Sequence, residues 1–99
     1  MKCSVRILRR AVRDLEEINA YLRHKAPSGA GDLLDDLLDA IESLGDFASR
    51  GATPRDDRLR GQGFRFLVQR PYLVFYKVRG RTVRVYRVLH GRRAWAALL

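Results

Sequence analysis

The sequence predicts an α+β fold in which a helical hairpin packs on one face of a mainly antiparallel β-sheet. Residues 11–47 show the three- and four-residue apolar spacing of two amphipathic helices. Residues 64–89 hold three runs rich in β-branched and aromatic residues, as strands do. A short alternating run near the N-terminus predicts one more strand. Because the helices and the later strands come in separate groups, we expect one helical layer on one sheet.

The first half of the chain accounts for one strand and both helices. Residues 4–8 alternate weakly between apolar and polar, and the first helix is expected over residues 11–25, before Pro27. A second helix is expected over residues 32–47, with its acidic residues on the wet side. The link at 28–31 is so short that the helices should lie antiparallel. The stripes expected to face the sheet are Val12, Leu15, Ile18 and Leu22, and then Leu34, Leu37, Leu38, Ile41 and Leu44.

The second half predicts a loop, three strands and a C-terminal tail. Gly80 can adopt positive φ in a tight turn between the last two strands. In the last strand, Val83, Val85 and Leu89 are expected on one side together with Arg87. A β-hairpin alone is marginally stable, so the helices should cover one face and leave a cationic face exposed. The segments expected are a loop at 49–63, strands at 64–68, 72–78 and 82–89, and a helix-prone tail at 92–99.

Length and composition indicate a single domain, residues 1–99, with a small core. A single cysteine, Cys3, cannot form an internal disulfide, which fits a reducing compartment. No apolar run approaches the roughly 20 residues of a membrane span. The N-terminus also lacks the apolar segment of a secretion signal. We therefore expect a cytoplasmic protein that does not enter a membrane.

The positive charge lies almost entirely in the second half. Residues 1–49 carry a net charge of −2 and residues 50–99 carry +11, within a total of +9. Seventeen of the 20 basic residues are arginine, which suits planar recognition of phosphate or carboxylate. This asymmetry predicts an acidic partner, either nucleic acid or an acidic protein segment. A solvated basic surface is the simpler alternative.

The familiar motifs of catalysis and cofactor binding are absent from the sequence. There is no P-loop, no dinucleotide-binding glycine motif and no pair of spaced cysteines. With only His24, His90 and Cys3 as soft ligands, no metal site and no cofactor are expected. His90 could act as an acid or base, although a packing role at a strand end explains it as well. The remaining candidates are basic residues that could converge on the sheet: Arg58, Arg60, Arg65, Arg84, Arg87, His90, Arg92 and Arg93.

Several motifs together resemble the RelE/ParE superfamily of bacterial toxins, and the ParE branch most closely. The resemblance covers nearly the whole chain. It is carried by Arg9-Arg10-Ala11, Asp14-Leu15 and Ile18, by Leu59-Arg60-Gly61, by Tyr72, Val74-Phe75-Tyr76 and Val78, and by Arg87-Val88-Leu89-His90-Gly91-Arg92-Arg93. It implies a βααβββ fold that is poisonous when free and neutralised by an antitoxin.

The resemblance implies one of two activities. RelE-like members cleave mRNA with several basic residues and a tyrosine. The positions that match those residues hold Arg65, Leu67, Leu73, Arg93 and Leu99, so two cations and the terminal phenol are missing. ParE-like members lack this apparatus and trap DNA gyrase. The chain departs from the RNase pattern in the same direction, so we expect a non-catalytic gyrase inhibitor.

The resemblance also implies the surfaces for target and antitoxin. A ParD-like antitoxin with an acidic C-terminal segment should form a hetero-oligomer with the chain and alone contact operator DNA. The alternatives are an mRNA endoribonuclease that uses Arg65, Arg87, His90 and Arg93, and a plain basic nucleic-acid-binding or structural protein. The expected gyrase-binding residues are Arg58, Arg60, Arg65, Arg92, Arg93 and Trp95, and the expected antitoxin-binding residues are Tyr21, Leu33, Leu37 and Arg84.

Overall fold

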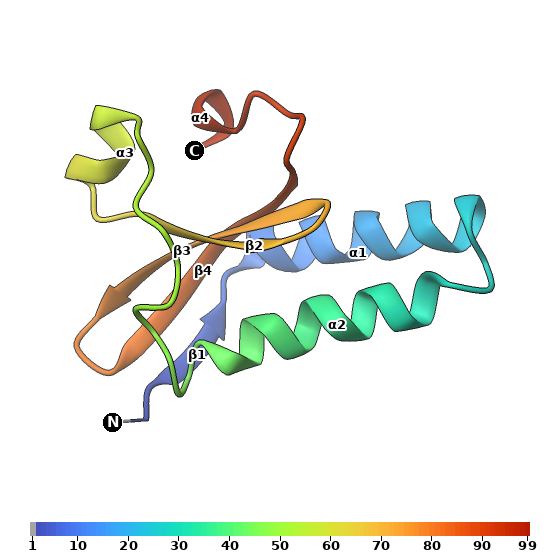
Figure 1. Cartoon of the computed structure of the whole chain (residues 1–99), viewed down its shortest axis with the longest axis horizontal. Helices are drawn as coiled ribbons and strands as arrows, with labels where there is room; N and C mark the ends of the chain where they lie inside the picture. Colours follow the sequence, from blue (N-terminus) through green and yellow to red (C-terminus); the bar gives the residue numbers. More distant parts are fainter. Residues whose placement is uncertain (1) are drawn as a thin grey trace.

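The structure is a computed structural model that describes residues 2–99 (Figure 1). Its order confirms the predicted strand, two helices, three strands and tail, and it adds a short helix, α3, inside the predicted loop. No helix within residues 2–99 has the length and apolar composition needed to cross a bilayer. The elements are β1 (Ser4–Ile7), α1 (Arg9–Lys25), α2 (Ala30–Ser43), α3 (Asp57–Gly61), β2 (Arg65–Gln69), β3 (Tyr72–Arg79), β4 (Thr82–His90) and α4 (Trp95–Leu98).

The four strands form one mixed sheet in the order β1-β4-β3-β2. β2, β3 and β4 are antiparallel, as predicted, whereas β1 lies parallel to β4. α2 ends at Ser43 rather than near Phe47, because the chain turns there and the Gly45 carbonyl accepts a hydrogen bond from the Cys3 N–H at 2.6 Å. This bond joins the end of α2 to the start of the sheet.

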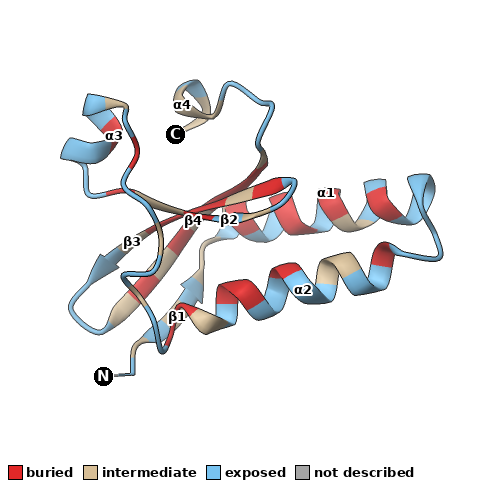
Figure 2. Cartoon of the chain, in the orientation of Figure 1, coloured by how far each residue is buried: buried red, intermediate tan, exposed pale blue. Residues whose placement is uncertain are grey.

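The helical hairpin of α1 and α2 covers one face of the sheet and encloses the main core (Figure 2). Leu15, Ile18 and Leu22 of α1 are buried, as their spacing predicts. Two residues of the predicted stripes are exposed instead: Val12 at 41% and Leu38 at 39%. Asp14, which was not part of the predicted stripe, lies on the buried side of α1 and is only 3% exposed.

A second apolar cluster covers part of the opposite face, which corrects the prediction that this face stays exposed. Leu59 of α3 packs with Phe64, Phe75 and Leu89 of the sheet side, and the C-terminal tail adds Trp95 and its neighbours. The Asp56 side chain caps α3 by accepting a hydrogen bond from the Leu59 N–H at 2.9 Å. The face is therefore divided between this cluster and the charged end of the β3–β4 hairpin.

A β-bulge changes which face the end of β4 presents. Tyr76 pairs with Val85 but Phe75 pairs with Arg87, so Tyr86 is an extra residue in β4. The predicted alternation is therefore wrong beyond Val85. Arg87 lies in register with Phe75 of the second cluster, while Val88 joins the main core.

The hydroxyl of Tyr76 connects the sheet to the loop after α2. It donates a hydrogen bond to the Ala48 carbonyl at 2.8 Å and accepts one from the Gly51 N–H at 3.0 Å. We expect Tyr76→Phe to lower the free energy of unfolding by about 1–3 kcal/mol, because two backbone groups lose their partner. Urea unfolding measures this. The control Tyr21→Phe, at an exposed phenol, should stay within about 0.5 kcal/mol of wild type.

The same phenol should make the fold sensitive to alkali. Burial, opposed by the Gly51 hydrogen bond and by nearby Arg65 and Arg50, raises the pKa of Tyr76 above 10.0. The unfolded chain therefore loses this proton at a lower pH than the folded chain does, and stability should fall as pH rises above 10. Tyr76→Phe should reduce that dependence.

Candidate functional site

A buried carboxylate replaces the missing strand neighbour where β1 ends. The last hydrogen bond that links the end of β1 to β4 is donated by the Leu8 N–H to the Val85 carbonyl at 3.0 Å. Beyond it, Asp14 Oδ2 accepts hydrogen bonds from the Val88 N–H at 3.0 Å and from Arg87 Nε at 2.8 Å. Asp14 Oδ1 accepts from Arg87 Nη2 at 3.1 Å and lies 2.9 Å from Arg10 Nη1. Asp14 thus holds α1 against the edge of β4.

Arg87 extends this connection to the C-terminal tail. Its Nη1 donates to the Leu98 carbonyl at 2.9 Å, while Arg58 Nη2 from α3 donates to the Ala96 carbonyl. The Trp95 ring packs against Phe75 with their centroids 5.2 Å apart. Two arginines and one aromatic contact therefore fix the tail over the second cluster.

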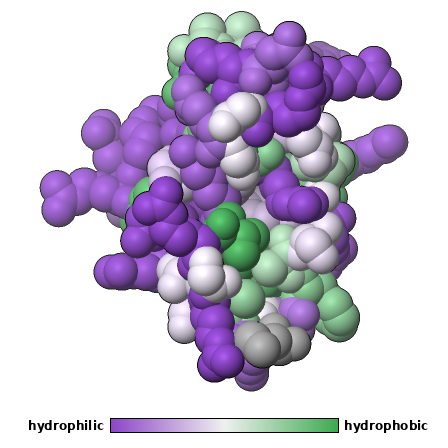
Figure 3. Space-filling view, turned by 90° about the vertical axis from the view of Figure 1, so that its left-hand side faces the viewer, coloured by the Kyte–Doolittle hydropathy of each residue, from purple (hydrophilic) through white to green (hydrophobic). Residues whose placement is uncertain are grey.

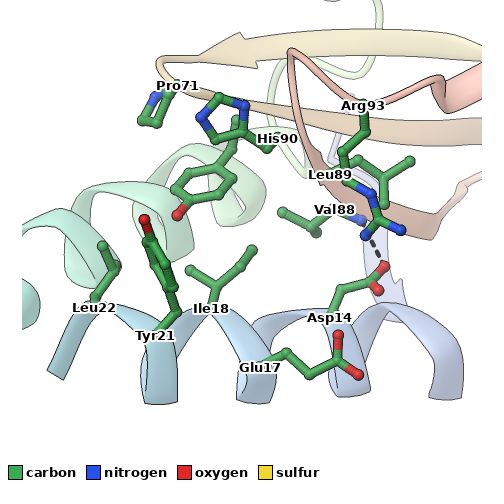
Figure 4. Close-up of a pocket in the computed structure, with 11 residues that line it drawn as sticks. Asp14, Glu17, Ile18, Tyr21, Leu22, Pro71, Val88, Leu89, His90 and Arg93 are labelled. Carbon is green, nitrogen blue, oxygen red and sulfur yellow. Dashed lines mark hydrogen bonds between the residues drawn. The ribbon is translucent and has the colours of Figure 1, made fainter. Parts of the chain in front are cut away.

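A groove of about 390 Å³ lies between α1 and the ends of β3 and β4 (Figure 4). Ile18, Tyr21 and Leu22 line it from α1, and Val88 and Pro71 face them across the gap. Tyr21 is 56% exposed, so its ring is open to a partner. The groove combines an apolar wall with polar ends, which suits a peptide segment with an apolar anchor.

Charged groups of both signs lie at this groove. Glu17 and Asp14 belong to α1, whereas His90 and Arg93 come from the end of β4 and the segment after it. His90 Nδ1 accepts a hydrogen bond from the Arg92 N–H at 3.1 Å, which orients the ring. Burial, and secondarily Tyr21, raises the pKa of the Tyr72 phenol above its ordinary value.

The expected basic cluster is distributed over several regions. Arg58 contacts the tail, and Arg65 donates to the carbonyls of Ser49 and Gly51 in the loop after α2. Arg87 is buried at 8% exposure in its ion pair with Asp14 and acts as a structural residue. The other candidates lie elsewhere: Arg60 beside Asp57, Arg84 near the distal end of β3–β4, Arg92 exposed after β4, and Arg93 and His90 in the groove.

The residues expected to contact an antitoxin differ in their accessibility. Tyr21 is exposed at the groove and Leu33 is partly buried against the core. Leu37 is fully buried at 0% exposure, which corrects its prediction as a surface anchor. Leu37 lies inward because it aligns with Ile41 and Leu44 on the buried stripe of its helical segment.

Two residues of the site were missed in the sequence, Asp14 and Glu17. A signal for Asp14 is present, because it falls between Ala11 and Ile18 on the apolar stripe and must therefore find buried partners. Glu17 gives no such signal, since its place at the groove depends on how α1 meets the sheet. Within residues 2–99 no group of three or more His, Cys, Asp or Glu side chains is placed to hold a metal ion.

Comparison with known proteins agrees with this architecture. The model of the family "ParE toxin of type II toxin-antitoxin system, parDE" matches residues 5–95. A protein of Sinorhizobium fredii named "Putative toxin Y4kP" is 28% identical over 90 residues, covering 91% of this chain and 90% of its own length.

Two solved structures share the fold. A chain of the chromosomal ParDE toxin–antitoxin system from P. aeruginosa superposes with a TM-score of 0.74 and 23% identity, covering 90% of this chain and 96% of its own. A chain of the toxin–antitoxin complex RelBE2 from Mycobacterium tuberculosis gives a TM-score of 0.64 and 24% identity, covering 91% and 99%. With the family model matching nearly the full length, the chain belongs to the ParE toxins of type II toxin–antitoxin systems.

Proposed function

We propose that the chain inhibits DNA gyrase by binding it, without catalysing a reaction, and that a ParD-like antitoxin neutralises it. The observation that carries the choice of a binding mechanism is the state of Arg87. This arginine is buried between Asp14 and the tail, so it is not free to stabilise a reacting phosphate. Because Arg87 serves the fold, we infer that the toxin acts through its surface.

The positions that an mRNA-cleaving relative would use support the same choice. Leu67 is buried in the main core, and Leu73 and Leu99 pack with the second cluster. Arg65 is bound to loop carbonyls, and Arg93 lies at the groove. Cleavage of RNA needs an acid, a base and cations close together, and these residues do not provide that arrangement.

We propose that gyrase is contacted by the tail together with α3. Trp95 is half-buried against Phe75, so one part of its ring is supported while the rest remains accessible. Arg58 fixes the backbone beside it, and Arg60 and Arg92 are exposed. A supported aromatic ring with arginines on the neighbouring segments has the composition typical of an interaction hot spot.

The antitoxin is proposed to place an extended or helical segment in the groove along α1. Tyr21 and the neighbouring apolar wall would receive its apolar side chains, and Arg93 would pair with a carboxylate. The two related solved structures are of toxin–antitoxin systems, which supports a partner of this kind. The toxin, its antitoxin and gyrase would meet in the cytoplasm.

One observation favours RNA cleavage as the second candidate. His90 and Arg93 both line the groove, where a histidine and a cation could act on a bound phosphodiester. In that case the groove would be an active site rather than an antitoxin site. Expression of the chain in bacteria distinguishes gyrase inhibition from RNA cleavage.

The test is controlled expression of the chain in bacteria, with and without a co-encoded acidic partner. We expect replication to stop and chromosomal DNA to be broken while messages remain intact, and we expect the partner to restore growth. The variant His90→Ala should remain toxic. Rapid cleavage of messages that disappears in His90→Ala would instead establish the RNase activity.

A further inference from the structure

Three positive side chains lie side by side across three strands. Arg6 of β1 is in register with Arg84 of β4, and Arg84 is in register with Lys77 of β3. Neighbouring strands lie about 4.8 Å apart, so these charges are close. Like charges directly opposite one another destabilise a sheet. We call Arg6, Arg84 and Lys77 the cation row.

The cation row projects from the face opposite the helical layer. Val5, Val83 and Tyr76, which precede the three cations in sequence, belong to the main core or pack against it. Because side chains alternate along a strand, the row points to the other side. Arg79 follows Lys77 by two residues and shares this face, which brings the number of cations to four.

Within residues 2–99 these four cations have no acidic side chain as an ion-pair partner. Among the ion pairs formed within residues 2–99, none involves Arg6, Lys77, Arg79 or Arg84. Nine of the chain's 11 acidic residues lie within residues 14–46, on or next to the helical layer. The end of the molecule that holds the β3–β4 turn is hydrophilic over much of its area, with apolar atoms at the centre and lower right of the view and at its top (Figure 3). A ligand that carries negative charge would therefore relieve the repulsion among these cations.

A hollow of about 170 Å³ adjoins the row. Lys77, Arg79 and Arg84 line it together with Gln62 and Tyr86. The Lys77 ammonium lies 5.0 Å from the centre of the Tyr86 ring, and that ring is half-buried. Surfaces that bind single-stranded nucleic acid combine positive charge along the backbone with aromatic side chains, and this hollow holds both, although Lys77 and Phe64 already contact the Tyr86 ring.

We propose that the cation row and its hollow bind the backbone of single-stranded nucleic acid. Guanidinium groups engage phosphate oxygens in pairs, and a line of cations across a rigid sheet matches a chain of phosphates better than a single anion. An acidic peptide is a weaker fit, because the hollow offers only Val78 and the Tyr86 ring as apolar anchorage among its polar and charged lining residues. This site is separate from the groove. Gln62 places the hollow next to the end of α3, but the cations of the row are not among the residues proposed to contact gyrase.

The test uses the purified chain and a fluorescent twelve-nucleotide oligo-dT, with binding measured by anisotropy across a salt series. If four cations each neutralise a phosphate, the logarithm of the binding constant should fall with the logarithm of salt at a slope of about −2.8. In the double variant Arg6→Gln/Arg84→Gln the slope should weaken to about −1.4. The matched control Arg13→Gln/Lys25→Gln removes the same charge from exposed positions of α1 and should keep the wild-type slope.

Competing probes decide what kind of anion the row accepts. The proposal would be overturned if a twelve-residue polyglutamate peptide bound more tightly than oligo-dT, or if a twelve-base-pair duplex bound more tightly than the single strand. It would also be overturned if the two double variants changed the salt slope equally. Thermal unfolding gives a second readout. Arg84→Gln should raise Tm at low salt by relieving repulsion, and a lower Tm would show that Arg84 has a structural partner, contrary to the proposal.

Discussion

Replacement of Asp14 with alanine should lower the free energy of unfolding by about 3–5 kcal/mol, as expected when one member of a buried ion pair is removed. Arg87 would keep its buried charge without a counter-ion, and the Val88 N–H would lose its acceptor. A domain of this size has roughly 5–15 kcal/mol of stability in total, so the variant should be close to unfolding. Urea unfolding monitored by circular dichroism measures the change.

The matched control for this prediction is Glu17→Ala. Glu17 is exposed on the same helix and lies 3.8 Å from Arg10, so its removal should cost less than about 0.5 kcal/mol. The double variant Asp14→Leu/Arg87→Met should recover part of the loss, because no buried charge remains unpaired. A cost for Asp14→Ala as small as that of Glu17→Ala would contradict the structural role of the pair.

Trp95→Ala should weaken inhibition of gyrase about 30-fold or more. This factor corresponds to the roughly 2 kcal/mol that defines a hot-spot residue. The physical reason is that Phe75 already holds the indole ring in place, so little conformational entropy is lost when a partner covers it. Alanine at this position would remove the ring and the apolar area that it offers to gyrase. The measurement is the toxin concentration that halves the supercoiling rate.

The control for Trp95 is Phe47→Ala. Phe47 is 65% exposed just after α2, and its truncation removes an aromatic ring outside the proposed gyrase surface. Its inhibition should stay within twofold of wild type, and antitoxin binding should be kept in Trp95→Ala. Equal inhibition by the wild type and Trp95→Ala would place the target surface away from the tail.

The helical layer and the order of elements could be predicted because they depend on local periodicity. Leu15, Ile18 and Leu22 repeat at helical spacing, and the β-branched runs around Val74 and Val85 define the paired strands. The bulge at Tyr86 could not be predicted, since it depends on how two strands pair rather than on either strand alone. Because of the bulge, Arg87 lies on the opposite face of the sheet from the one expected.

The site was harder to predict than the fold because its residues are distant in sequence. Asp14 and Arg87 are 73 residues apart, and their ion pair exists only because β1 ends early and leaves the edge of β4 open. The cation row likewise depends on register across β1, β4 and β3. The charge of the second half was visible in the sequence, but the division of that charge among the core, the tail and the cation row was not.

The most direct test of the proposed toxin mechanism is a supercoiling reaction with purified gyrase, relaxed plasmid, ATP and the purified chain. We expect supercoiling to stop and cleaved plasmid to accumulate in covalent complexes with gyrase. The reaction should recover when the cognate antitoxin is added, and an mRNA included in the same tube should stay intact. Normal supercoiling at saturating toxin, with the mRNA cut, would contradict the proposal and identify an RNase.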